Sequence, residues 1–181
     1  MSLFSFPFRG RSLAALLLVA TFSTEAPADE GPAPGSPAVE HVRIADPTTA
    51  WALRRALQGA ARYLERPECQ RILWDFASSE GRPLHEILDA QAKTGPAFLQ
   101  SLIFYDGSHH PRCRLKQTYA VAFPGSRVVF VCTARFQEIA MRKARLAQVV
   151  LIHEALHALG LGENPPSSAE ITHRVENRCL P

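Results

Sequence analysis

The 181-residue sequence predicts a single α+β domain that is mostly helical, with a small β-hairpin or sheet packed on one central helix. Three observations lead to this fold class. Apolar residues recur at helical spacing in several segments, two short strand-like runs flank a Pro-Gly turn, and apolar residues make up 46% of the chain. That fraction, beside 20% charged residues, is enough to bury a core and argues against disorder.

Residues 1–28 are typical of a signal peptide for export. Two arginines precede an apolar run over 13–22, which is too short to span a bilayer. The sequence Ala-Pro-Ala at 26–28 then supplies a cleavage site, although cleavage near Ser23 also fits. We therefore expect a secreted or periplasmic protein with no stable membrane insertion after the signal peptide is removed.

Proline and glycine dominate the segment that follows the predicted signal peptide. Residues 29–46 contain Pro32, Pro34 and Pro37, and this composition is typical of a linker. The folded domain is therefore expected over 47–181.

The charge pattern predicts no nucleic-acid partner. The formal net charge is +3, and no block of like charges occurs. The sequence gives no indication of the oligomeric state.

The secondary-structure elements are predicted from periodicity and from residues that begin helices and turns. Thr49 can cap a first helix, and Pro83 suits the first turn of another. Pro124 and Gly125 suit the central positions of a type II turn, which favours a hairpin. The expected elements are helices over 51–64, 68–76 and 83–88, a strand-like run at 102–105, hairpin strands at 118–123 and 127–131, helices from about 134 and 144, and a last helix over 167–179.

The segment from His153 to His157 is an HExxH motif. On a helix the two histidines lie one turn apart on one face, so both imidazoles can bind one zinc ion at about 2.0–2.1 Å. Glu154 is rotated by roughly 100° about the helix axis, so it reaches a water on the zinc rather than the metal itself. Zinc lowers the pKa of such a water towards about 7, and a nearby carboxylate then acts as general base and acid. The apolar run at 149–152 indicates a buried helix, whose polar groups need partners such as a metal.

The motif continues as HExxHxxGxxE, which resembles the zincin metallopeptidases and, in its spacing, the elongated motif of the metzincins. In that pattern a glycine ends the helix, and the residue six positions after the second histidine returns to the metal. The resemblance implies that Gly160 forms the turn and that Glu163 is the third zinc ligand. The chain departs from the metzincins because Met1 and Met141 both precede the motif, so no Met turn follows it.

The third ligand has two alternatives in the related gluzincin pattern, where a glutamate on a later helix binds the metal. Glu170 and Glu176 are the candidates, and Glu176 has the more suitable distance from His157 in the sequence. Ser167 and Glu170 also form a capping box, which is a structural role, and Glu170 is a further candidate for a hydrogen bond to a ligand histidine.

Other features concern the surroundings of the motif. Zincins pair an extended substrate with an edge strand beside the active helix, and either hairpin strand is a candidate for that edge; a hairpin that only covers the core is the alternative. Tyr119 and His173 are candidates for stabilising an oxyanion. His109 and His110 follow a turn and are expected in a surface loop rather than at a second metal site.

The four cysteines include no CxxC pair, which argues against a cysteine zinc site and, in an exported chain, favours disulfides. Three pairings are open. We favour Cys113–Cys132 across the hairpin region together with Cys69–Cys179, and free buried thiols are the alternative.

The sequence therefore predicts an exported zinc metallopeptidase that hydrolyses peptide or protein substrates. Zn²⁺ would be bound by His153, His157 and Glu163, with Glu154 as the catalytic base. The alternative is a degenerate, non-catalytic zinc-binding domain that binds a protein partner.

Overall fold

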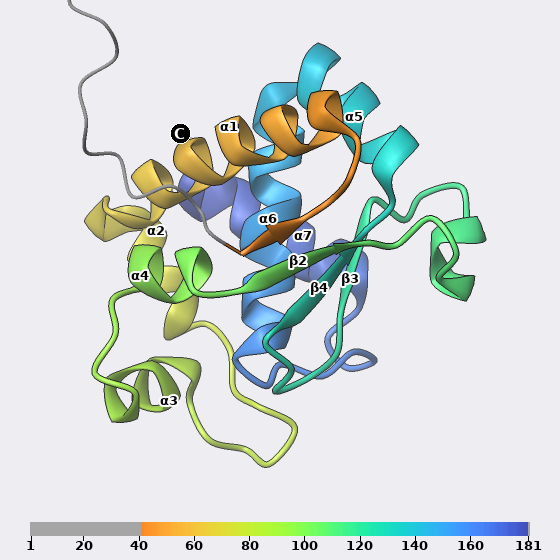
Figure 1. Ribbon diagram of the computed structural model, residues 1–181. Helices are drawn as coiled ribbons and strands as arrows, with labels where there is room; N and C mark the ends of the chain where they lie inside the picture. The colour runs from red at the N-terminus through yellow and green to blue at the C-terminus, as the bar shows by residue number, and fades with distance from the viewer. Residues whose placement is uncertain (1–40, 181) are drawn as a thin grey trace, which may run out of the picture. The chain divides into compact units, whose positions relative to one another are not determined.

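The computed structural model describes residues 41–180, so the predicted signal peptide over 1–28 lies outside the described residues. The fold is α+β, as predicted, with a four-stranded mixed sheet packed on a mainly helical body (Figure 1). The helices are α1 (Pro47–Leu64), α2 (Pro67–Gln70), α3 (Leu84–Ala90), α4 (Gly95–Gln100), α5 (Thr133–Arg142), α6 (Ala144–Ala158) and α7 (Ser168–Cys179), with short 3-10 helices η1 (Arg71–Leu73) and η2 (Pro111–Arg114).

The sheet places a short antiparallel strand at one of its edges. Its strands are β1 (Val42–Arg43), β2 (Ile103–Asp106), β3 (Ala120–Ala122) and β4 (Val128–Val131), and their spatial order is β1-β2-β4-β3. β1, β2 and β4 are parallel, whereas β3 is antiparallel to β4, with Val121 opposite Phe130. The predicted hairpin is therefore present, and β3 is an edge strand.

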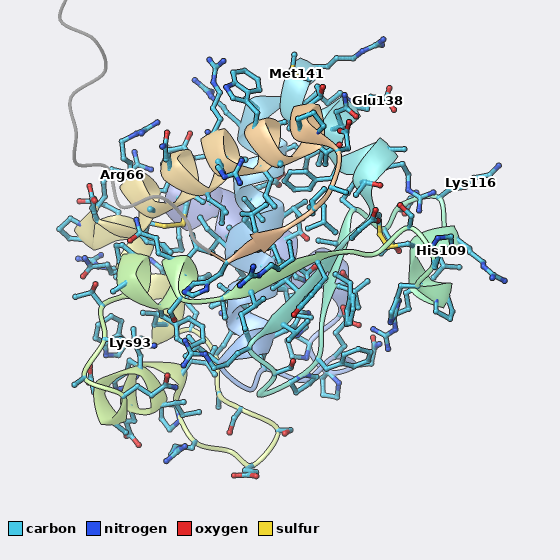
Figure 2. The ribbon with its side chains drawn as sticks, in the orientation of Figure 1. Arg66, Lys93, His109, Lys116, Glu138 and Met141 are labelled. Atoms are coloured by element: carbon cyan, nitrogen blue, oxygen red, sulfur yellow. A yellow bond between two sulfur atoms is a disulfide. The ribbon has the colours of Figure 1, made fainter. Side chains whose placement is uncertain are left out.

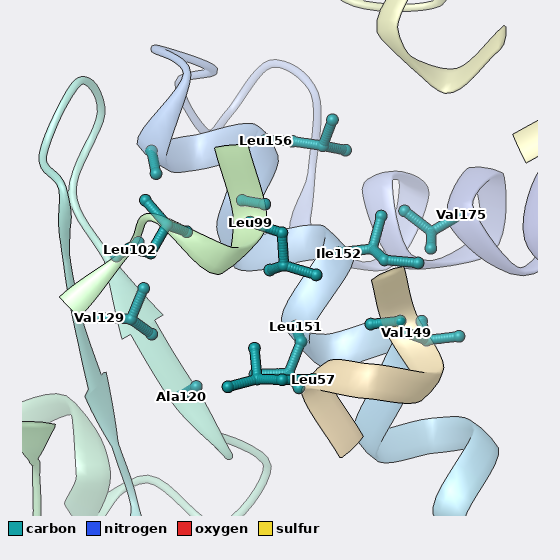
Figure 3. Close-up of a cluster of buried hydrophobic side chains, with 14 of the residues drawn as sticks. Leu57, Leu99, Leu102, Ala120, Val129, Val149, Leu151, Ile152, Leu156 and Val175 are labelled. Carbon is teal, nitrogen blue, oxygen red and sulfur yellow. The ribbon is translucent and has the colours of Figure 1, made fainter. Parts of the chain in front are cut away.

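Helix α6 forms the centre of the core. It contacts α1, α4, α5 and α7 as well as strands β3 and β4. Figure 3 shows Leu151, Ile152 and Leu156 of α6 among apolar side chains that include Leu99 and Val129, and all five are at most 1% exposed. Burial of one such side chain stabilises the fold by roughly 1.5–3 kcal/mol. The apolar run before the HExxH motif thus makes the helix a buried one.

Helix starts follow from local capping residues. Asp46 caps α1, since its Oδ2 accepts a hydrogen bond from the Thr49 N–H at 2.6 Å, and Pro47 occupies the first turn. Thr49 itself lies inside the helix, so the prediction that it caps the helix is wrong; its hydroxyl donates to Gln137 Oε1 at 3.2 Å. At α7 the Ser167 hydroxyl accepts from the Glu170 N–H at 3.2 Å, as in the predicted capping box.

Two predicted boundaries need correction. β1 lies within residues 29–46, which the sequence assigned to a linker, so the folded part begins before residue 47. The reason is that Val42 pairs with Phe104, far away in the sequence, and a two-residue strand has no periodicity of its own. The helix predicted over 68–76 is interrupted. After Gln70 the α-helix α2 gives way to the 3-10 helix η1, which has fewer residues per turn and ends at Leu73.

Helices α3 and α4 differ from expectation in smaller ways. Pro83 precedes α3 rather than occupying its first position. α4 has no counterpart in the prediction because Gly95 and Pro96 suggested only an interruption, although Thr94 caps it through a bond from the Ala97 N–H at 3.3 Å.

Two disulfides join the pairs that the sequence analysis favoured. Cys69–Cys179 ties α2 to α7 across 110 residues, and Cys113–Cys132 ties η2 to the end of β4 (Figure 2, yellow bonds). The described residues contain no free cysteine. Over 41–180 no helix combines the length and apolar character that a bilayer crossing requires.

Candidate metal centre

The last two turns of α6 bring His153, Glu154 and His157 into the protein interior. Each of these side chains is no more than 7% exposed. The spacing of four residues directs both imidazoles to one face, where the two Nε2 atoms lie 3.0 Å apart. A metal ion bound by both nitrogens at about 2.0–2.1 Å would lie to one side of the line that joins them.

The other nitrogen of each imidazole is already engaged. His153 Nδ1 lies 3.1 Å from the Thr172 hydroxyl of α7, and His157 Nδ1 lies 2.7 Å from the Leu161 carbonyl oxygen. Because a carbonyl oxygen can only accept, His157 carries its proton on Nδ1. Its Nε2, which faces His153 Nε2 and the Glu163 carboxylate, is the ring nitrogen left to bind a metal.

The turn after α6 is a Schellman motif centred on Gly160. The Leu161 N–H donates to Leu156 O at 3.1 Å, and the Gly160 N–H donates to His157 O at 2.8 Å. Gly160 has a φ of +116°, and a Cβ there would lie 3.1 Å from the Ser78 Cβ. The positive φ favours glycine, and the contact with Ser78 would be tight for any larger residue. The turn also presents the Leu161 carbonyl to His157, so the end of the helix fixes a histidine of the motif.

Beyond this turn Glu163 returns to the two histidines. Its Oε1 lies 3.6 Å from His157 Nε2, and one potential ligand atom from each of His153, His157 and Glu163 lies within 4.8 Å of the others. Between residues 41 and 180 no other group of three such side chains meets this criterion. The two alternative glutamates, Glu170 and Glu176, are not part of the group.

Glu170 and Glu176 have other positions. Glu170 lies in the first turn of α7 and forms an exposed ion pair with Arg174 at 3.8 Å. Glu176 lines the cleft described below, one turn after the Thr172 that contacts His153.

Burial opposes the charged form of the His153 imidazole. It lowers the pKa of His153 to about 3, with a smaller contribution from the neighbouring His157. A neutral imidazole retains the lone pair that a metal ion needs. Glu163 is more accessible, and Arg112 Nη1 lies 3.9 Å from its second oxygen. A buried pair of imidazoles thus meets a carboxylate that is held at the surface.

Glu154 lies beside the group but is not one of its members. Burial raises its pKa to about 8, and the hydrogen bond from the Ala122 N–H to Oε2, at 2.5 Å, acts in the opposite direction. A cation bound by the three neighbouring side chains would favour the ionised carboxylate. The side chain therefore links α6 to strand β3 and keeps its second oxygen for other partners.

The three residues of the group and Glu154 line one wall of a cleft of about 1470 Å³. Strand β3 forms another wall, and helix α7 contributes Thr172, His173 and Glu176. The two residues that the sequence suggested for an oxyanion, Tyr119 and His173, both line this cleft. Sequence alone gave no reason to place either of them there.

The edge strand turns part of its backbone towards the cleft. Cys132 donates its N–H to the Tyr119 carbonyl at 2.9 Å, which marks a hydrogen-bonded pair. Because such pairs alternate along antiparallel strands, Ala120 and Ala122 point their backbone groups away from β4. The Ala122 N–H donates to Glu154, and Ala120, which is 5% exposed, lines the cleft.

Two participants were missed by the sequence analysis. Thr172 and Arg112 carry no motif, and each reaches the site only because α7 and η2 fold over it. His109 and His110 are outside the group, as expected for loop histidines: His110 Nδ1 accepts from the Arg112 N–H at 3.3 Å, and its ring stacks on Phe130.

The donor set fits a divalent metal ion, because the Nε2 atoms of two imidazoles and a carboxylate converge there. Comparison with known proteins identifies no matching family model, no similar curated protein and no similar solved structure. The site must therefore be interpreted from its own chemistry.

Proposed function

We propose that this protein is a zinc-dependent peptidase. The observation that carries the proposal is the convergence of His153, His157 and Glu163 on the wall of a cleft that is bordered by an edge strand. Two histidines and a glutamate are a usual donor set for hydrolytic zinc sites, in which one coordination position stays open. Zinc bound there would polarise a carbonyl and provide a nucleophilic water near neutral pH.

Glu154 is the proposed general base. The Ala122 N–H holds one oxygen of its carboxylate, so the other oxygen can take a proton from the attacking water. The carboxyl group then returns this proton to the leaving nitrogen as the C–N bond breaks, and the water oxygen becomes part of the new carboxyl terminus. This role needs a fixed carboxylate that does not itself bind the metal.

Strand β3 is the proposed docking edge for an extended substrate. It is an edge strand that lines the cleft, and strand addition places few demands on the substrate's sequence. Polypeptide segments without tertiary structure would meet this requirement best.

The two disulfides are compatible with an extracellular protein, because such bonds persist in oxidising compartments. Together with the predicted signal peptide, they support the proposal that the protein is secreted or periplasmic.

A non-catalytic metal-binding domain is the second candidate function. It is favoured by one observation: Glu154 is buried and already serves as a hydrogen-bond partner of β3. In that case the carboxylate would hold the hairpin on α6, and the cleft would bind a protein partner without cleaving it.

Metal analysis combined with hydrolysis assays distinguishes the two functions. The purified wild-type protein and a Glu154→Gln variant should each hold about one equivalent of zinc, while hydrolysis of a diverse peptide pool falls by about 10²–10⁴-fold in the variant. Glu170→Gln is the matched control, because Glu170 lies on the exposed first turn of α7, and it should be fully active. A wild-type protein that holds zinc but cleaves nothing in the pool would support the non-catalytic function.

A further inference from the structure

A second hollow adjoins the cleft on the side of helix α5. It has a volume of about 170 Å³, and we call it the basic pocket. Tyr119 and Lys116 line both the cleft and the basic pocket, so the two spaces share a boundary. The lining of the basic pocket consists of Lys116, Tyr119, Arg135, Glu138, Ile139, Arg142 and Lys143.

Positive charge dominates this pocket, with four cationic side chains against the single carboxylate of Glu138. That carboxylate pairs with Arg142 at 4.0 Å. Within residues 41–180 no acidic side chain forms an ion pair with Lys116, Arg135 or Lys143. Figure 2 shows Lys116 extending outward from the segment before β3.

The end of helix α5 does not account for this cluster. Cations near a helix C-terminus interact favourably with the helix dipole, which explains Arg142 and Lys143. Arg135 lies near the start of the same helix, where its Nε donates to the Thr118 carbonyl at 3.0 Å, and Lys116 belongs to another segment. The fold thus gathers cations that are scattered in the sequence.

We propose that the basic pocket binds an acidic side chain of the polypeptide that occupies the cleft, so that acidic polypeptides are the substrate class. This inference rests on the proposed peptidase function. Carboxylates on a bound chain would neutralise cations that lack a partner, and they would do so beside the edge where the chain docks.

The orientation of β3 predicts where the acidic residue lies. A chain paired antiparallel to β3 passes Ala122 first, next to Glu154, and then continues past Ala120 towards Tyr119 and Lys116. The acidic residue therefore follows the cleaved bond. Lys116 precedes Ala122 by six positions, which corresponds to at most about 20 Å of extended chain, so the acidic residue should lie within about six positions of the bond.

Cleavage-site mapping on a random peptide pool tests this prediction. Aspartate and glutamate should be enriched C-terminal to the cleaved bonds, and the enrichment should disappear in a Lys116→Gln/Lys143→Gln double variant. The control is Arg54→Gln/Arg62→Gln, which removes two exposed cations of α1 that line neither space and should keep the enrichment. Cleavage without acidic enrichment, or with enrichment only N-terminal to the bond, would overturn the proposal.

A binding assay separates this inference from the proposed function. The Glu154→Gln protein should bind a fluorescent glutamate-rich peptide about 10-fold more tightly than the same peptide with glutamines, and raised salt or the double variant should abolish the difference. If the wild type cleaves nothing while this preference holds, only the proposed function fails. Equal binding of the two peptides, or a pocket that binds heparin but shows no preference for the glutamate-rich peptide, would overturn the inference.

Discussion

Helix α6 is buried on two faces, one apolar and one polar, and the two faces have different roles. Leu151, Ile152 and Leu156 pack into the apolar core (Figure 3), whereas His153 and its neighbours in the motif line the cleft. Apolar burial stabilises the fold, while buried polar groups reduce stability unless they have partners. One helix therefore combines an apolar face that stabilises the fold with a polar face whose side chains form hydrogen bonds to Thr172, Leu161 and Ala122.

The largest effect is expected on the cleft face. His157→Ala removes one of the two imidazoles that we propose as zinc ligands, so zinc affinity should fall by more than about 100-fold, since even outer partners of ligands change affinity by 10–100-fold. Competition with a chelating dye measures this, and far-UV circular dichroism should show that the helices remain. His173→Ala is the control, because His173 lines the cleft outside the ligand group. Equal zinc affinity of the His157 variant and wild type would refute the site.

The adjacent residue on the core face should behave in the opposite way. Leu156→Ala leaves a cavity among packed side chains, so the free energy of unfolding should fall by about 2–5 kcal/mol in urea titrations. Zinc affinity of the folded fraction should stay within a few-fold of the wild type. A large loss of zinc affinity without loss of stability would show that the two faces are not independent.

Glu154 tests whether the polar face reduces stability, because burial opposes ionisation of its carboxyl group in the metal-free protein. Its pKa rises from 4.5 to about 8, so its favourable contribution is complete below pH 4.5 and is lost as the pH rises through 8. With chelator present, Glu154→Gln should therefore gain stability over the wild type between pH 5 and pH 8, by on the order of 4 kcal/mol. Urea titrations at the two pH values measure this gain, and the same difference at both would contradict it.

The smallest effect on zinc affinity is expected at Thr172, whose hydroxyl contacts His153. Thr172→Val removes the hydroxyl beside His153 Nδ1 and keeps the shape of the side chain. Zinc affinity should drop by about 10-fold, the lower end of the range for such partners, and Ser168→Val on the same helix should leave the affinity unchanged. A zinc affinity equal to that of the wild type would mean that the hydroxyl does not orient the imidazole.

Local patterns predicted the parts of the fold that depend on local chemistry. The spacing of His153 and His157 sufficed to place both rings on one face. The turn at Gly160 that returns Glu163 to them was implied by the resemblance of the longer motif to the zincins. The hairpin around Pro124 also follows from its own turn residues.

Features that depend on distant segments could not be predicted in this way. β1 exists only through its pairing with β2, and Thr172 reaches His153 only because α7 packs on α6. The basic pocket was not predicted for the same reason. No block of like charges occurs in the sequence, and only the fold brings Lys116 close to α5. Recognising such features requires knowledge of which surfaces meet.

The nested arrangement of the two disulfides bears on the order in which the chain matures. Cys69 emerges first during synthesis, and its partner Cys179 follows 110 residues later, roughly 5–20 s at ordinary rates of translation. Cys113 and Cys132 appear in that interval, so the first thiol available to Cys69 belongs to the wrong partner. Pairing in order of appearance would join Cys69 to Cys113. A chain whose cysteines pair in this order reaches the native pairing only by thiol exchange, so we predict that a disulfide isomerase raises the yield of native protein more than an oxidant alone.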